Sequence, residues 1–220
     1  DWTVLMIVPE GDFVGVIGDN SRNTLLMSVG LVVIVSVLAA LLVRQGLRSD
    51  RTVREVLVRR KMLQRQSTAF GELAGRAGRL AAGEDEATSQ SMEILAEAMR
   101  ARRVGLWAWT EQTQVLRCED MFDRESGGHT QGTELSRDEF PGALEALSSG
   151  ETVGIADVTA DERFRLISRS YFEPLGSRSL LVADVRCGGE SVGLVWFEDS
   201  LARAWLAEER AFAGAVAAVL

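Results

Sequence analysis

Residues 23–43 contain no charged side chain, and this stretch constrains the fold more than any other feature of the chain. As a helix rising about 1.5 Å per residue it would be roughly 31 Å long, which matches the hydrocarbon thickness of a bilayer. A buried helix of a soluble core is the alternative, but such helices rarely run this far without a polar stripe. The sequence therefore predicts a transmembrane helix over residues 23–43.

Basic residues are distributed asymmetrically about this segment. Residues 1–22 carry one basic and four acidic side chains, whereas residues 44–65 carry eight basic and two acidic ones. Lys and Arg are retained on the cytoplasmic side of a membrane crossing. We therefore expect a single crossing of the inner membrane in this chain, with the lipid bilayer as a partner and the C-terminal part in the cytoplasm.

The part of the chain beyond the basic segment is acidic. Residues 66–220 carry fifteen basic and twenty-six acidic side chains, so we expect no nucleic acid partner. Cys118 and Cys187 both follow the predicted crossing, and no C-x-x-C pair is present. The sequence therefore predicts neither a structural disulfide nor a metal site.

Residues 1–22 begin with an apolar, β-rich run, Trp2 to Val8, which ends at Pro9. One strand cannot bury a core, so this segment is interpreted as the tail of a domain. The motif WTVLMIVPE resembles the end of a Cache-type extracytoplasmic sensor domain, whose last strand leads into a membrane helix. The resemblance implies a truncated sensor domain over residues 1–22, and we expect a further crossing before it.

Residues 44–66 form the predicted cytoplasmic linker, a signalling helix. Val56, Leu63, Phe70 and Ala77 recur every seven residues, with Leu73 and Leu80 at the second seam position, where Arg59 and Gln66 stand in the earlier turns. This imperfect heptad predicts a weak parallel coiled coil and hence a parallel homodimer. The alternative is an amphipathic helix lying on anionic lipid.

Residues 67–220 alternate between strand and helix patterns, with at least one adjacent antiparallel pair of strands. A Gly188-Gly189 turn supports a hairpin because paired glycines supply the backbone angles that tight turns require. These patterns predict an α+β domain with an antiparallel sheet flanked by helices. The predicted strands are 104–110, 114–121, 152–157, 179–187 and 191–198, and the predicted helices are 91–103, 136–147, 161–172 and one starting near Trp205.

Four stretches of this domain resemble a GAF domain, the small-ligand sensory module of bacterial signalling proteins. They are IADVTADERF at 155–164, LGSRSLL at 175–181, VADVRCGGESVGLVWFE at 182–198 and WLAEERAFA at 205–213. The resemblance spans residues 67–220. It implies an antiparallel sheet, terminal helices that often build a parallel dimer, and a pocket between the sheet and residues 161–172.

The resemblance leaves the ligand unknown. The asparagine-lysine-phenylalanine-aspartate-glutamate signature of the cyclic-nucleotide-binding branch is absent, and the single histidine, His129, lies in a glycine-rich loop where we expect it to be solvent-exposed. We therefore expect no cofactor and an unidentified small molecule as ligand, if the pocket is occupied. Apolar walls with a few polar groups are typical of such pockets. The candidate ligand-binding residues are Trp107, Trp109, Asp157, Arg163, Tyr171 and Arg178.

Each candidate also has a structural interpretation. The two tryptophans share one face of a strand and would fill the core, while Arg163 and Arg178 would pair with neighbouring carboxylates. A domain without a ligand would act as a dimerising relay.

Two functions remain open from the sequence. In the first, the chain is a non-catalytic input and relay segment of a membrane-bound receptor, which controls a histidine kinase, a diguanylate cyclase or phosphodiesterase, or an adenylate cyclase. In the second, the cytoplasmic domain is itself a hydrolase. Gly189 to Gly193 fits the G-x-S-x-G pattern around Ser191, but that chemistry needs a helix after the serine and a histidine later in the chain. The sequence favours the first function and predicts no catalytic residue.

Overall fold

The computed structural model describes residues 11–110, 114–147 and 150–220, and the chain divides into two compact units, Asp1–Arg59 and Arg60–Leu220. Residues 1–10, where the sequence predicts the last strand of a sensor domain, lie outside the described residues.

The first unit consists of helix α1, which begins at Gly11 and continues to Ala74 in the second unit. Its segment Thr24–Leu42 is 19 residues long, is apolar enough to cross a membrane, and contains no buried residue. Leu31 and Val35, for example, are 64% and 57% exposed.

The second unit is built on a single sheet of antiparallel strands in the order β3-β2-β1-β7-β6-β5, with β4 pairing with β2 beside β3. The strands are β1 (Arg103–Trp109), β2 (Val115–Asp123), β3 (Gly128–Thr130), β4 (Glu134–Ser136), β5 (Val153–Ile155), β6 (Ser179–Cys187) and β7 (Glu190–Asp199). The predicted fold class is confirmed.

The predicted hairpin, formed by β6 and β7, lies between β5 and β1 in this sheet. Strands β6 and β7 pair from Ser179 with Asp199 to Cys187 with Glu190. Gly188 and Gly189 form the turn at φ 61° and 92°, in the left-handed region that favours glycine.

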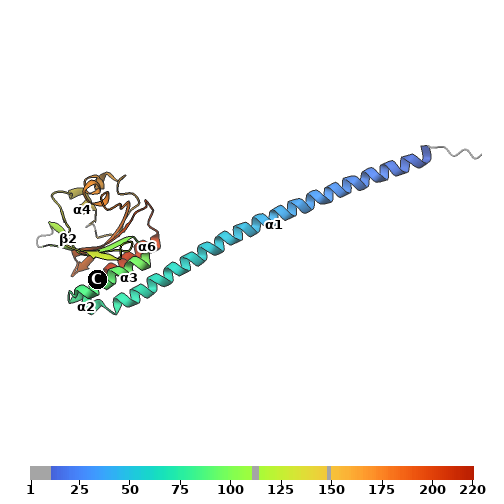
Figure 1. Ribbon diagram of the computed structural model, residues 1–220. Coiled ribbons are helices and arrows are strands. Elements are labelled where there is room, and N and C mark those ends of the chain that lie inside the picture. The colour runs from blue at the N-terminus through green and yellow to red at the C-terminus, as the bar shows by residue number, and fades with distance from the viewer. Residues whose placement is uncertain (1–10, 111–113, 148–149) are drawn as a thin grey trace, which may run out of the picture. The chain divides into compact units, whose positions relative to one another are not determined.

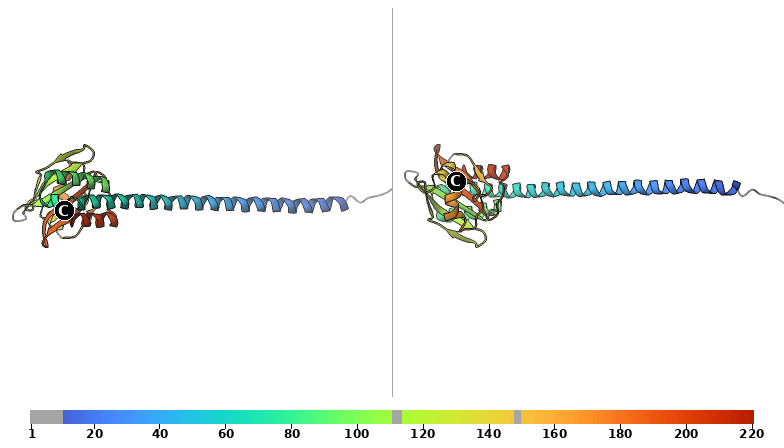
Figure 2. Two further views of the ribbon diagram at one scale, coloured as in Figure 1. Left: turned by 90° about the horizontal axis from the view of Figure 1, so that it is seen from below. Right: turned by 90° about the horizontal axis from the view of Figure 1, so that it is seen from above.

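One face of the sheet is covered by three helices. These are the last turns of α1, α3 (Asp85–Met99) and α6 (Ala207–Ala217), whose apolar residues form one core with the sheet. In Figure 1, α3 and α6 lie below the sheet, and Figure 2 shows both beside the last turns of α1. Leu73 of α1, Leu95 of α3 and Val216 of α6 are completely buried there. The predicted last helix begins at Ala207, two residues after the predicted start at Trp205.

The opposite face is covered by shorter and less regular segments. They are α4 (Pro141–Leu147), the 3-10 helix η2 (Glu162–Phe164), α5 (Arg165–Ile167) and the π-helix η3 (Ser168–Phe172). Apolar residues of these segments form a second core with the sheet. The predicted helix over 161–172 is therefore present, but it changes hydrogen-bonding pattern twice.

Only some residues of the predicted coiled-coil seam are exposed and could contact a second helix. Gln66 and Leu73, at the second seam position, are 5% and 0% exposed because they pack on the sheet domain, where the Gln66 amide lies 3.6 Å from Sδ of Met99. Val56 and Leu63 are exposed. The seam does not continue to Ala77 and Leu80, since α1 ends at Ala74 and these residues belong to α2 (Ala77–Ala81). A coiled coil through the second seam position is therefore excluded from Gln66 onward.

Two local predictions need correction. The helix predicted over 136–147 begins only at Pro141, because Glu134–Ser136 pairs with β2 as strand β4. His129 is solvent-exposed as predicted, but it does not lie in a loop. It belongs to β3, its Nδ1 lies 2.9 Å from Oδ2 of Asp120, and its Nε2 lies 3.2 Å from Oε1 of Glu93.

Candidate functional site

The structure distributes the six candidate residues over three places in the sheet domain. Trp107 on β1 and Tyr171 on η3 lie in the second core. Asp157 and Arg163 line a surface depression, and Arg178 contacts Asp157. Trp109 lies at the end of β1, half-buried against the second core.

The first place is a cluster of aromatic rings between the sheet and η3. The ring of Trp107 lies 4.8 Å from that of Trp196 and 5.8 Å from that of Tyr171, measured between centroids. Phe172 completes the cluster at 5.1 Å from Tyr171 and 5.8 Å from Trp196. Trp107, Trp196 and Phe172 have no exposed surface. The region where the resemblance implied a pocket therefore holds these four side chains.

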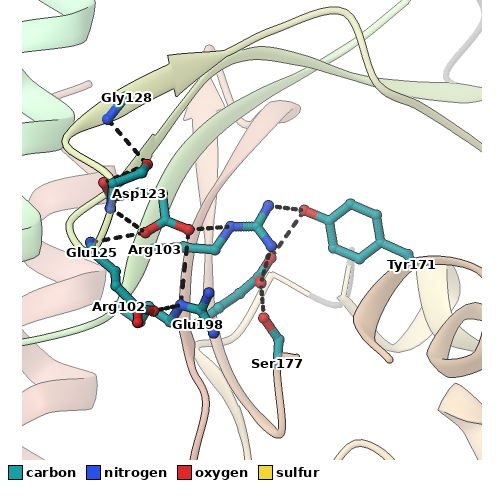
Figure 3. A network of polar contacts seen from close by, with 9 residues as sticks. Arg102, Arg103, Asp123, Glu125, Gly128, Tyr171, Ser177 and Glu198 are labelled. Carbon is teal, nitrogen blue, oxygen red and sulfur yellow. Dashed lines mark hydrogen bonds and ion pairs between the residues drawn. The ribbon is translucent and has the colours of Figure 1, made fainter. Parts of the chain in front are cut away.

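Two polar residues that the sequence analysis did not single out lie beside this cluster. The Glu198 side chain, at the end of β7, is completely buried, and its Oε2 lies 3.2 Å from Nη1 of Arg103 on β1. The Tyr171 hydroxyl donates to Oε1 of Glu198 at 3.0 Å, and the Ser177 hydroxyl donates to Oε2 at 2.5 Å. Figure 3 shows both hydroxyls and the Arg103 guanidinium pointing at this one carboxylate.

The network continues to the surface at the end of β2. Nε of Arg103 lies 3.9 Å from Oδ2 of Asp123, and Nε of Arg102 lies 3.0 Å from Oε2 of Glu125. Burial raises the pKa of Glu198, while Arg103 and the two hydroxyls act in the opposite direction. Burial and the nearby carboxylate raise the pKa of Tyr171 well above its ordinary value, so this phenol remains a donor.

The second place is an open depression of about 550 Å³ after β5, lined by residues 154–157 and 160–163. Arg163 donates to Asp161 from Nε at 3.0 Å, and the backbone N–H of Arg163 donates to the same carboxylate at 3.0 Å as the cap of η2. The Arg178 Nε donates to Asp157 at 3.2 Å. These bonds hold the pKa of both aspartates below the ordinary value. Each arginine is thus bound to a carboxylate, as in the structural interpretation above.

The third place contains the serine of the G-x-S-x-G pattern. Ser191 lies on strand β7, where its hydroxyl donates to Asp184 and accepts from the indole N–H of Trp109 at 3.2 Å. A nucleophile elbow requires a helix after the serine and a histidine beside it. Here a strand follows, and His129 is bonded to Asp120 and Glu93 instead. The Ser191 hydroxyl therefore connects β1 to the β6–β7 hairpin.

Within the described ranges, no group of three or more His, Cys, Asp or Glu residues is arranged to hold a metal ion. The features that the sequence analysis missed are Trp196, Phe172 and the Arg103–Glu198 pair. Alternation along β7 places Trp196 on the same face as Leu194 and Glu198, and this was the available signal.

Comparison with known proteins identifies this architecture. Residues 84–220 match the model of the GAF domain family. A search of the curated proteins found no match.

Three solved structures illustrate the shared fold, at sequence identities that support similarity of fold only. A GAF domain of nlh2 from A. aeolicus, described as in an inactive state, has a TM-score of 0.53 and 12% identity, covering 72% of this chain and 94% of its own. The phycocyanobilin-bound GAF domain of a cyanobacterial phytochrome has a TM-score of 0.58 and 16% identity, covering 70% and 90%. The GAF domain of an Acinetobacter phosphoenolpyruvate-protein phosphotransferase has a TM-score of 0.52 and 15% identity, covering 70% and 89%.

Proposed function

Because the chain belongs to the GAF domain family, we propose that it is the input and relay segment of a membrane-bound bacterial signalling receptor. Residues 1–22 would end an extracytoplasmic, Cache-like sensor domain, and residues 23–43 would cross the inner membrane. Residues 44–66 would carry the signal to the cytoplasmic GAF domain. The domain would in turn control an output domain of the receptor, such as a histidine kinase or an enzyme of cyclic nucleotide signalling.

The observation that carries this proposal is that one continuous helix, α1, contains both the apolar segment and residues of the domain core. One helix, Gly11–Ala74, contains both the apolar segment Thr24–Leu42 and the residues Ala69 and Leu73, which are buried in the core of the GAF domain. A rotation or shift of α1 would therefore act on packed core residues, and packed cores favour discrete arrangements over continuous deformation. The opposite face of the sheet is filled by aromatic side chains, which supports a relay that works without a resident ligand.

The orientation is tested by the reactivity of a natural cysteine. Cys187 is exposed beside the turn between β6 and β7, whereas Cys118 is buried, which raises the pKa of its thiol to about 12. Because the thiolate is the reactive form, a membrane-impermeant maleimide should label Cys187 alone. We expect labelling after the cells are permeabilised and none in intact spheroplasts.

Two controls accompany this measurement. The Cys187→Ser variant should not be labelled in permeabilised cells, which shows that Cys118 stays protected. The protein should also remain in the membrane fraction after extraction at high pH. Labelling of Cys187 in intact spheroplasts would place the GAF domain outside the cytoplasm and contradict the proposal.

We further propose that the receptor is a parallel homodimer whose helices meet at Val56 and Leu63. These residues are 65% and 47% exposed and lie seven positions apart on the face that remains after Gln66, Ala69 and Leu73 have packed on the domain. A chain anchored in one membrane can pair with a second copy only with both helices pointing the same way. The exposed stripe would then form the contact between the two helices.

Disulfide cross-linking tests the position of this contact. In the Cys187→Ser background, Leu63→Cys should give a cross-linked dimer under mild oxidation. Leu57→Cys is the matched control, because Leu57 is 51% exposed but lies about 120° around the helix from Leu63. Equal cross-linking at both positions, or none at Leu63, would contradict a contact along this stripe.

A further inference from the structure

The segment from Glu162 to Ser177 covers the aromatic cluster with unusually irregular backbone. It passes from 3-10 helix (η2) to α-helix (α5) to π-helix (η3) within eleven residues, and a turn with Gly176 at φ 67° follows. Short 3-10 and π segments have poorer hydrogen-bond geometry than a continuous α-helix, and π segments are frequent at functional sites. A segment of this kind gains little stability from its own backbone bonds.

The contact layer under this segment contains polar atoms without partners. The Ser168 hydroxyl and the indole N–H groups of Trp107 and Trp196 are buried and make no hydrogen bond among the described residues. These three residues are at most 1% exposed. An unpaired buried polar group lowers stability, and it would recover its hydrogen bond with water if the layer opened. Packing of the segment against this layer is therefore less stable than packing against a layer of apolar groups alone would be.

Both ends of the turn are attached to the sheet through one carboxylate. Tyr171 precedes the turn and Ser177 ends it, and their hydroxyls donate to the two oxygens of Glu198 at 3.0 Å and 2.5 Å. Glu198 is held in turn by Arg103 on the adjacent strand. As Figure 3 shows, the two hydroxyls reach this carboxylate from the same segment. Leu166 and Leu175 on the outer surface are 57% and 37% exposed, so few contacts hold the segment from outside.

From these three observations we infer that residues 162–177 form a strap that opens and closes over the Trp107–Trp196 cluster, with Glu198 as its latch. In the closed state, the latch bonds hold the strap against the sheet. In the open state, water solvates the buried indole and hydroxyl donors. The strap belongs to the GAF domain alone and does not depend on the membrane relay proposed above.

Hydrogen exchange measured by mass spectrometry tests the strap in the full chain, in lipid nanodiscs. In the unmodified protein, amides of residues 162–177 that are bonded in the closed state, such as Glu173 and Ser177, should exchange at least about tenfold faster than those of β6 and β7. Tyr171→Phe and Ser177→Ala each remove one bond to a charged group, and each should raise exchange in the strap by a further tenfold or so while leaving β6 and β7 unchanged.

Ser191→Ala is the matched control, because it also removes a hydroxyl that donates to a buried carboxylate, Asp184, but at a site outside the strap. It should leave exchange in residues 162–177 unchanged. The measurement on the unmodified protein needs no variant, so the test stands even where a substitution unfolds the domain. Exchange of the strap at the same rate as β6 and β7, or a uniform rise across the sheet in both latch variants, would overturn the inference.

Discussion

Replacing Glu198 by alanine is expected to lower the free energy of unfolding of the GAF domain by about 3–5 kcal/mol. The substitution leaves the Arg103 side chain, 7% exposed, without the carboxylate that lies 3.2 Å from it. It also leaves the hydroxyls of Tyr171 and Ser177 without their acceptor. Buried donors and charges without partners are one of the recognised causes of large destabilisation by single substitutions.

Chemical denaturation of Glu198→Ala measures this loss, and Glu125→Ala provides the control. Glu125 also pairs with an arginine of the same network, Arg102 at 3.0 Å, but its side chain is 73% exposed. The control should therefore lose at most about 1 kcal/mol. If the two variants lost equal stability, burial would not be what makes the Glu198 pair important.

A double-mutant cycle separates the pair from its surroundings. Arg103→Ala combined with Glu198→Ala should destabilise the domain by less than the two single losses added together, because neither buried charge then remains without its partner. Additive losses would mean that Arg103 and Glu198 act independently, in contradiction to the geometry.

The sheet could be predicted in large part from local patterns. Strand β2 alternates between buried and exposed residues, whereas β1, β6 and β7 are buried over continuous runs, and all four contain aromatic or β-branched residues. Gly188-Gly189 marks the hairpin turn directly. Strand β4 could not be found in this way. It has three residues with a single buried side chain, Leu135, and its preceding and following polar residues resemble the start of a helix.

The candidate site was harder to predict from the sequence, because the residues that form it lie far apart along the chain. Glu198 follows Trp196 and Phe197 at the end of a strand, a position that in isolation indicates an exposed carboxylate. Its burial depends on Arg103 at the start of β1 and on Tyr171 in η3, which the fold brings together. Trp107 and Tyr171 were predicted as ligand-binding candidates, and in the structure they fill this region together with Trp196 and Phe172.

The coiled-coil prediction shows a related limit. A heptad pattern reports which residues are apolar, but it does not distinguish packing on a second helix from packing on the chain's own domain. In the sequence, Leu73 is compatible with packing on a second helix and with packing on the chain's own domain. In the structure it is completely buried in the core of the GAF domain. The pairing face that we propose for α1 therefore rests on exposure, which favours Val56 and Leu63.

Replacing Gly193 by alanine is expected to destabilise the domain by about 3 kcal/mol, near the upper end of the range for overpacked cores. Gly193 on β7 pairs with Ala108 on β1. A Cβ at this position would overlap the carbonyl oxygen of Trp107 and lie 3.3 Å from its carbonyl carbon and 3.4 Å from Cα of Ala108. These are backbone atoms of the neighbouring strand, so no side-chain rotation relieves the overlap, and β1 and β7 would have to separate locally.

The same substitution at Gly71 should change the free energy of unfolding in the opposite direction, which makes it a strict control. Gly71 lies in α1, and a Cβ there would meet no atom within 4 Å. Alanine has a higher helix propensity than glycine, so Gly71→Ala should stabilise the protein by up to about 1 kcal/mol. Thermal unfolding of the two variants beside the unmodified chain measures both effects. Similar stability for Gly193→Ala and the unmodified chain would mean that β1 and β7 are not paired as closely as the register from Arg103 to Ala108 requires.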